Sequence, residues 1–233
     1  MITCRAIQWF NISEYKVKRQ KHIKIFIVGI LMTLISPFYA QSDYDLAIST
    51  AAEQLAGLHN GTLVVRIYMN KNKADLLQKT IQDPATSEEK RKSLSHLLKT
   101  HLEDRELYKK NVIKAFRNEY HFSKVVFIHD YDQKKLANGR EAGIFLNDQG
   151  IVDPSIKMES DYYLLCGRGN NDDSFVIYAP NGDNMPTHFP NKYNRNIFEG
   201  LASLFIKDKM ANYVRKLDGL LGNRYEMWKE VMK

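Results

Sequence analysis

A near-continuous apolar run, Lys124–His129 (KVVFIH), is the feature that most constrains the fold of this chain. Such a run is typical of a strand that is covered on both faces, because neither set of its alternating side chains is suited to water. Residues 62–68 (TLVVRIY) are rich in β-branched and aromatic side chains and predict another strand. The chain therefore requires a sheet with helices packed on it.

The sequence predicts a long amphipathic helix between these two strands. Asp83 and Pro84 are expected at its start, with Asp83 as the N-cap and Glu88 and Glu89 near the positive end of the helix dipole. Large side chains then recur every three to four residues for roughly 30 residues, with charged residues between them. This series comprises Leu94, Leu98, Leu102, Arg105, Tyr108, Val112, Phe116 and Tyr120.

The remaining segments predict further elements on both sides of this core. Helical spacing is found over residues 43–58, 73–82 and 196–216, and Gly219 and Gly222 are expected to interrupt the last helix before a short one over 225–232. Residues 143–146 predict a third strand, 162–166 and 175–179 a hairpin, and 188–190 a short edge segment.

These elements predict an α/β or α+β fold with a mixed sheet of five to six strands and helices packed on its faces. A thioredoxin-like sheet is the alternative, although the Cys-x-x-Cys redox motif is absent. Neither an internal repeat nor a low-complexity linker divides residues 41–233, so we expect one globular domain there.

Residues 1–40 are predicted to comprise an N-terminal extension and a secretory signal peptide. A basic stretch, VKRQKHIK, precedes the uncharged run IFIVGILMTLI of about 11 residues, and a small residue, Ala40, stands before the expected cut. An uncleaved anchor is the rival interpretation, but a membrane-spanning helix needs about 20 apolar residues. Cleavage leaves Cys166 as the single cysteine, so the domain is expected to depend on a packed core and not on a disulfide.

The charge of the predicted mature chain argues against nucleic acid as a partner. Removing the six basic residues and one acidic residue of segment 1–40 from the totals of 34 and 27 leaves 28 basic and 26 acidic residues. The resulting net charge of +2 is small, whereas tight binding to a polyanion requires many clustered cations.

The strongest candidate for chemistry is the cluster His129, Asp130 and Asp132 at the end of the apolar strand, with Asp153 as a further carboxylate. Ligands of α/β sheets often lie beyond the carboxyl ends of strands, and a histidine with carboxylates can bind a metal or act as acid and base. The simpler interpretation is a solvated turn in which Asp is favoured.

Four other patterns are interpreted as structural. Residues 170–173 (NNDD) lack the ligand spacing of a calcium loop. Gly167-Arg168-Gly169 does not open a helix, as a phosphate-binding loop would. Cys166 alternates with apolar residues and is expected to be packed and inert. His96 and His101 are five residues apart, a spacing that does not suit a metal pair on a helix.

Several segments resemble an uncharacterised group of exported proteins common in Bacteroidota. The similar segments are residues 60–66 (NGTLVVR), the long charged helix, residues 115–122 leading into KVVFIHDYD, residues 152–156 (VDPSI) and the segment ending in Ala40-Gln41. The resemblance covers most of the chain after residue 40. It implies a periplasmic or surface location in a Gram-negative envelope, but no activity and no catalytic residues.

Together these patterns predict an exported envelope protein that acts without catalysis as a binding or accessory module. Its long helix or C-terminal segment would meet an envelope protein partner, with neither nucleic acid nor a membrane span involved after cleavage. No cofactor-binding motif and no metal-ligand set is predicted. The alternative is a periplasmic metal-assisted hydrolase that uses His129, Asp130 and Asp132.

Overall fold

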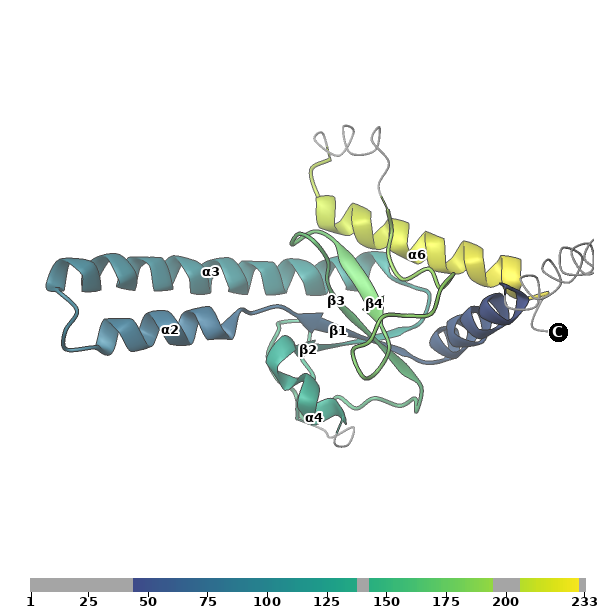
Figure 1. Cartoon of the computed structure of the whole chain (residues 1–233), viewed down its shortest axis with the longest axis horizontal. Coiled ribbons are helices and arrows are strands. Elements are labelled where there is room, and N and C mark those ends of the chain that lie inside the picture. Colours follow the sequence, from purple (N-terminus) through teal and green to yellow (C-terminus); the bar gives the residue numbers. More distant parts are fainter. Residues whose placement is uncertain (1–43, 138–142, 195–205, 231–233) are drawn as a thin grey trace, which may run out of the picture. The chain divides into compact units, whose positions relative to one another are not determined.

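The computed structural model describes residues 44–137, 143–194 and 206–230 (Figure 1). Its contacts divide the chain into two units, residues 1–48 and 49–233, and the sheet belongs to the second. The predicted signal peptide lies outside the described residues. Within the described ranges, none of the helices has the length and apolar character needed to cross a membrane.

A four-stranded mixed sheet lies at the centre of unit 49–233. Its strands are β1 (Thr62–Ile67), β2 (Lys124–His129), β3 (Tyr163–Arg168) and β4 (Phe175–Tyr178), in the order β2-β1-β3-β4. β1 pairs in parallel with β2 and β3, whereas β4 is antiparallel to β3. The predicted hairpin is therefore confirmed, and β2 has the limits that its apolar run predicts.

Helices cover one face of this sheet. Phe116, in the long helix α3 (Glu88–Glu119), packs edge-on against Phe127 of β2 and Phe175 of β4, with ring centroids 6.3 and 4.9 Å apart. Helix α6 (Lys209–Trp228) joins them through Tyr213, whose hydroxyl donates to the Phe175 carbonyl at 3.0 Å. Residues 49–60 continue the same layer, since the His59 ring stacks on Tyr225 of α6 with ring centroids 4.3 Å apart.

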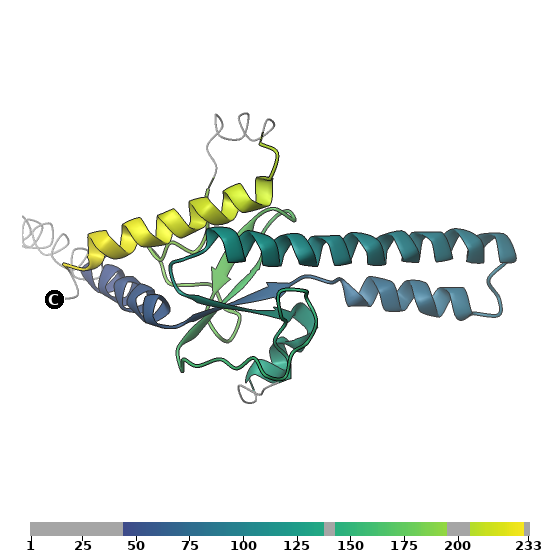
Figure 2. The ribbon, with the colours of Figure 1, turned by 180° about the vertical axis from the view of Figure 1, so that it is seen from behind.

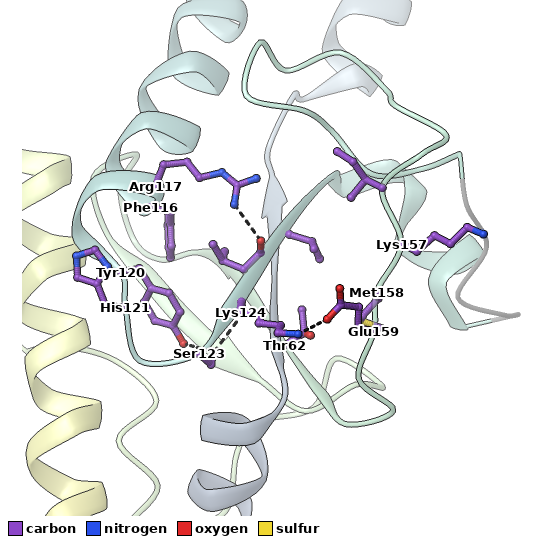
Figure 3. Close-up of a pocket in the computed structure, with 13 residues that line it drawn as sticks. Thr62, Phe116, Arg117, Tyr120, His121, Ser123, Lys124, Lys157, Met158 and Glu159 are labelled. Carbon is purple, nitrogen blue, oxygen red and sulfur yellow. Dashed lines mark hydrogen bonds and ion pairs between the residues drawn. The ribbon is translucent and has the colours of Figure 1, made fainter.

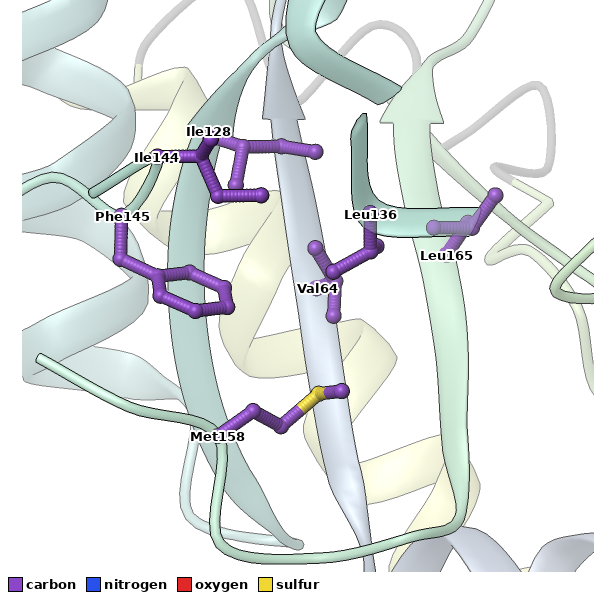
Figure 4. Close-up of a cluster of buried hydrophobic side chains, with 7 residues drawn as sticks. All are labelled: Val64, Ile128, Leu136, Ile144, Phe145, Met158 and Leu165. Atoms are coloured by element: carbon purple, nitrogen blue, oxygen red, sulfur yellow. The ribbon is translucent and has the colours of Figure 1, made fainter. Parts of the chain in front are cut away.

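The opposite face is covered by the chain between β2 and β3. One buried cluster joins three strand residues to side chains from helix α4 (Gln133–Ala137) and residues 143–158 (Figure 4). Its members are Val64, Ile128, Leu136, Ile144, Phe145, Met158 and Leu165. The sheet is thus buried on both sides, as the run KVVFIH predicts.

Helix α3 is a single helix of 32 residues, but it begins later than predicted. Ser87 is the N-cap, and its hydroxyl accepts the Lys90 N–H at 3.4 Å. Asp83 instead accepts the Ala85 N–H at 2.9 Å in the preceding turn. Helix α2 (Lys71–Gln82) lies alongside the first half of α3 in Figures 1 and 2.

The buried stripe of α3 also differs from the predicted series. Leu102 is 48% exposed, whereas its neighbour His101 is only 7% exposed. Tyr108, Val112 and Phe116 are buried as expected. Each residue advances by about 100° around the helix, so Leu102 lies about 120° from Tyr108, whereas His101 lies within about 20° of it. Leu102 therefore falls outside the buried stripe.

The predicted fifth and sixth strands are not confirmed. Leu146 makes only isolated antiparallel bridges, to Phe127 and to Val152, so residues 143–146 pack against β2 without extending the ladder. Residues 188–190 form no strand, and His188 has a positive φ of 76°, which is incompatible with extended backbone.

The predicted break in the last helix is wrong. Helix α6 runs through Gly219 and Gly222 up to Trp228 and includes part of the helix expected over 225–232. Each glycine costs about 1 kcal/mol relative to Ala in a helix. The buried side chains Tyr213, Val214, Leu217, Leu221 and Trp228 lie on both sides of the glycines and hold the helix on the core. The first part of the predicted helix, 196–205, lies outside the described residues.

Truncating Phe116 tests the assignment of the helix-covered core. Phe116→Ala should lower the free energy of unfolding by about 3–5 kcal/mol, because it removes a fully buried ring between two sheet residues. Leu107 lies on the same helix and is 60% exposed, so Leu107→Ala should change the free energy of unfolding by less than about 0.5 kcal/mol. Urea unfolding followed by circular dichroism measures both, and equal effects would contradict the described packing of α3.

Candidate functional site

The carboxyl ends of the three parallel strands form one edge of the sheet. β1 ends at Ile67, β2 at His129 and β3 at Arg168. The buried half of α3 crosses this edge, as the ion pair between Arg105 and Asp172 after β3 shows. This is the edge at which ligands of open α/β sheets bind. The structure thus places His129 where the sequence predicts it.

His129 is a buried and neutral side chain. Its residue is 9% exposed, its ring stacks on Tyr131 with centroids 4.9 Å apart, and its Nδ1 has no hydrogen-bond partner. Burial lowers the pKa of His129 below its ordinary value, and the nearby Lys109 ammonium lowers it further, against the opposing effect of Asp132. The imidazole is therefore uncharged at neutral pH.

The two neighbouring aspartates turn in different directions. Asp130 Oδ1 accepts the Met69 N–H at 3.2 Å and thereby joins the ends of β1 and β2. Asp132 is buried, and its Oδ1 lies 2.7 Å from the Lys135 ammonium while Oδ2 lies 3.7 Å from His129 Nδ1. The structure thus brings His129 and Asp132 together, but it uses Asp130 to hold two loops.

Asp153 does not join this cluster. Its carboxylate accepts the backbone N–H and the hydroxyl of Ser155 at 2.9 and 2.6 Å, and these bonds lower its pKa. Its own N–H donates to the Phe145 carbonyl, which places it beside the middle of β2 and not at the carboxyl edge. Asp153 is therefore a turn residue.

Two further observations bear on the predicted chemistry. Across the described part of the chain, no group of three or more His, Cys, Asp or Glu side chains is arranged to hold a metal ion. Cys166 is fully buried, and burial raises the pKa of its thiol to about 12, so the reactive thiolate does not form at neutral pH.

A hollow of about 540 Å³ lies at the opposite edge, near the first residues of β1 and β2 (Figure 3). Most of its polar side chains bind one another or the backbone, and His121 and Lys157 line it as well. Lys124 pairs with Glu159, and the Tyr120 and Ser123 hydroxyls lie 2.8 Å apart. Arg117 donates to the Val125 carbonyl at 3.4 Å. With these groups satisfied, the hollow offers few free polar groups that could orient a ligand.

A second cluster at the carboxyl edge has no counterpart in the predicted sites. Arg105 of α3 and Arg168 at the end of β3 both pair with Asp172, at 3.0 and 2.8 Å. His101 of α3 lies at the same place, and its Nε2 is buried without a hydrogen-bond partner. The sequence places Arg168, Asp172 and His101 only within patterns that are interpreted as structural. Arg105 is found there only as a member of the helical series.

Searches of protein-family models, curated proteins and solved structures find no match to this chain. The resemblance to exported proteins of Bacteroidota and the thioredoxin-like alternative therefore stay predictions.

The pH dependence of stability tests the environment of His129. The unfolded chain takes up the proton near pH 6.5, whereas the folded chain resists it because its pKa is lowered. Below pH 6.5 the unfolded state therefore binds more protons than the folded state. The free energy of unfolding thus decreases as the pH is lowered. We expect His129→Gln to reduce the loss of unfolding free energy between about pH 7.5 and 5.5, by no more than about 1.4 kcal/mol.

His96→Gln is the matched control, because His96 is an exposed histidine on the same protein's long helix. It should retain the pH dependence of the unaltered chain. Chemical denaturation at the two pH values measures both variants. An unchanged pH dependence in His129→Gln would show that this imidazole is not held neutral by burial.

Proposed function

We propose that the protein is exported and acts without catalysis as a binding module of the cell envelope. Its partner-facing surface is the helical arm, defined as α2 together with residues 88–100 of α3. The export rests on the sequence of residues 17–40. The binding role rests on one observation, the incompletely buried apolar seam of this arm.

No residue of α2 is buried, and the first buried residue of α3 is His101. The two helices nevertheless share an apolar seam, whose members are only half-buried: Ala74, Leu77 and Ile81 of α2 with Leu94 and Leu98 of α3. Short helices are marginal in water without tertiary packing. A third surface that covers this seam would therefore stabilise the arm.

Exposed leucines flank the seam and complete the surface. Leu76 is 65% exposed and Leu97 is 45% exposed. A partner helix that packs across these leucines would bury its own apolar residues at i, i+3 and i+4 spacing. The charges of the arm are mixed, with Glu88 and Glu89 beside Lys90, Arg91 and Lys92. The occupant that suits this surface is an amphipathic helix of another envelope protein.

The metal-assisted hydrolase draws less support from the geometry. Asp130 is engaged by the Met69 N–H and Asp132 by Lys135, so the two carboxylates do not converge beside His129. Metal analysis of the purified protein, with His129→Ala beside it, tests this alternative. A stoichiometric metal that disappears in the variant would favour the hydrolase over the binding module.

Cell fractionation tests the proposed export. We expect the protein in the periplasmic or surface fraction, with an N-terminus at Gln41, because the signal ends at Ala40. N-terminal sequencing of the purified protein measures this. Full-length protein in the cytosol would contradict export. It would not bear on whether the arm binds a partner, which crosslinking tests separately.

Charge insertion tests the arm. Leu76→Asp and Leu97→Asp should each abolish crosslinking to an envelope partner, since a carboxylate is costly to bury in an apolar interface. Both should leave the unfolding free energy within about 0.5 kcal/mol, because both sites are exposed. Met227→Asp, at a 63%-exposed position on α6, is the control and should crosslink normally.

The partner is identified by crosslinking in cells followed by mass spectrometry of the purified adduct. A crosslinked helical segment of another protein supports the proposal. Adducts containing only a second copy of the chain, or adducts equally lost in all three variants, would contradict it.

A further inference from the structure

The carboxyl ends of β1 and β3 lie at the switch point of the sheet, where the chain leaves two neighbouring strands toward opposite sides. From the end of β1 the chain leads to β2 on one side, and from the end of β3 it leads to β4 on the other. The two connections depart in opposite directions and leave a crevice between the strand ends. In open α/β sheets, ligands bind at such a crevice.

The structure contains a cavity of about 220 Å³ at this crevice. Three separate segments line it: the residues after β1, the middle of α3, and the end of β3 with the following loop. The lining side chains are Tyr68, Asn70, Lys73, His101, Asp104, Arg105, Arg168 and Asp172. Small-molecule pockets are typically about 300–1,000 Å³, so this one suits a small ion or a single functional group.

Two guanidinium groups share one carboxylate at this cavity. Asp172 bridges them, with Oδ2 3.0 Å from Arg105 and Oδ1 2.8 Å from Arg168. Each guanidinium also lies over an aromatic ring, Arg105 over Tyr108 at 4.9 Å and Arg168 over Tyr68 at 5.0 Å. A guanidinium has five N–H donors, so the single contact to Asp172 leaves donors on both for a further acceptor.

His101 supplies an independent indication of a ligand. It is 7% exposed, it lines the cavity, and its buried Nε2 has no hydrogen-bond partner. A buried polar atom without a partner costs about 1–3 kcal/mol. An imidazole nitrogen can donate a hydrogen bond, and an acceptor that reaches Nε2 from the cavity would remove this cost.

The N-terminus of α2 adds a positive end at the same place. Asn70 is its N-cap but makes no side-chain capping bond, and it has a left-handed backbone with φ 52°. The first turn of α2 contains no acidic residue, and Lys73 of that turn lines the cavity. Uncapped N–H groups and the helix dipole both favour an anion.

We propose that this cavity binds a small oxyanion, a phosphate or carboxylate group. Arg105, Arg168, His101 and Lys73 donate to it, and Asp172 fixes the two guanidiniums. Asp104 is the one lining carboxylate that no described arginine neutralises, and it limits the affinity for a dianion. Lys73 belongs to the helical arm, but the proposed partner surface rests on Leu76 and Leu97, neither of which lines the cavity. Either proposal can therefore fail without the other.

Calorimetric titration of the purified protein with inorganic phosphate, and separately with succinate, tests this site. We expect saturable binding with a Kd of about 1 mM or tighter for one of the two anions. The anion that binds more tightly identifies the class of ligand, and sodium chloride at equal ionic strength is the control for nonspecific screening.

Two variants locate the binding. Lys73→Glu should weaken the binding at least about tenfold, whereas Lys79→Glu, at the other end of α2, should change it less than about twofold. Both lysines are exposed, so neither change should impair folding. His101→Gln, checked for unaltered thermal unfolding, should weaken the binding without abolishing it.

Nuclear magnetic resonance provides a readout that does not depend on affinity. Addition of the binding anion should shift the backbone amides of Lys71 and Asn72 and the ring nitrogens of His101. The absence of saturable binding by either anion, equal loss in Lys73→Glu and Lys79→Glu, or shifts confined to other residues would each overturn the proposal.

Discussion

The parallel pairing of β1 with both of its neighbours is the constraint on which the rest of the structure depends. β1 is the second strand of four and is buried on both faces, with Leu63, Val64, Val65 and Ile67 inaccessible to solvent. Parallel neighbours require long crossover connections, because the chain must return to the same end of the sheet before each strand. The segments between β1 and β2 and between β2 and β3 are these connections, and each covers one face.

The same pairing explains why charged groups from distant segments meet. Parallel strands end at a common edge, so the residues after β1, β2 and β3 become neighbours although 61 residues separate Met69 from Asp130 in the bond that joins them. Helix α3 then crosses this edge and adds Arg105, which pairs with Asp172 67 residues later in the sequence. The parallel pairing of the strands thus determines which residues meet at the carboxyl edge.

Much of the fold could be predicted from local pattern. β2 has its predicted limits because every residue between its ends is apolar, and the β3–β4 hairpin follows from two β-rich runs around a polar loop. A strand was predicted over residues 143–146 because an apolar segment packed against a strand has the same composition as a strand. A break in the helix was wrongly predicted at Gly219 and Gly222, because burial of the flanking side chains outweighs the low helix propensity of glycine.

The residues that meet at the carboxyl edge of the sheet were harder to predict, because no common spacing in the sequence links them. His129 and Asp132 were found since they are adjacent to an apolar strand. Arg168 and Asp172 look like residues of an ordinary hairpin loop, and His101 is surrounded by exposed positions on a charged helix. Only the choice of the strands that pair brings these residues together, and no single segment encodes that choice.

The continuity of α3 has a mechanical consequence. The helix is about 48 Å long at 1.5 Å per residue, and only its second half is fixed to the sheet. Its first half packs on α2, which is itself joined to β1, so the helical pair is anchored to the sheet at two places. Force on the arm therefore reaches the sheet both through His101 and Arg105 of α3 and through the end of β1.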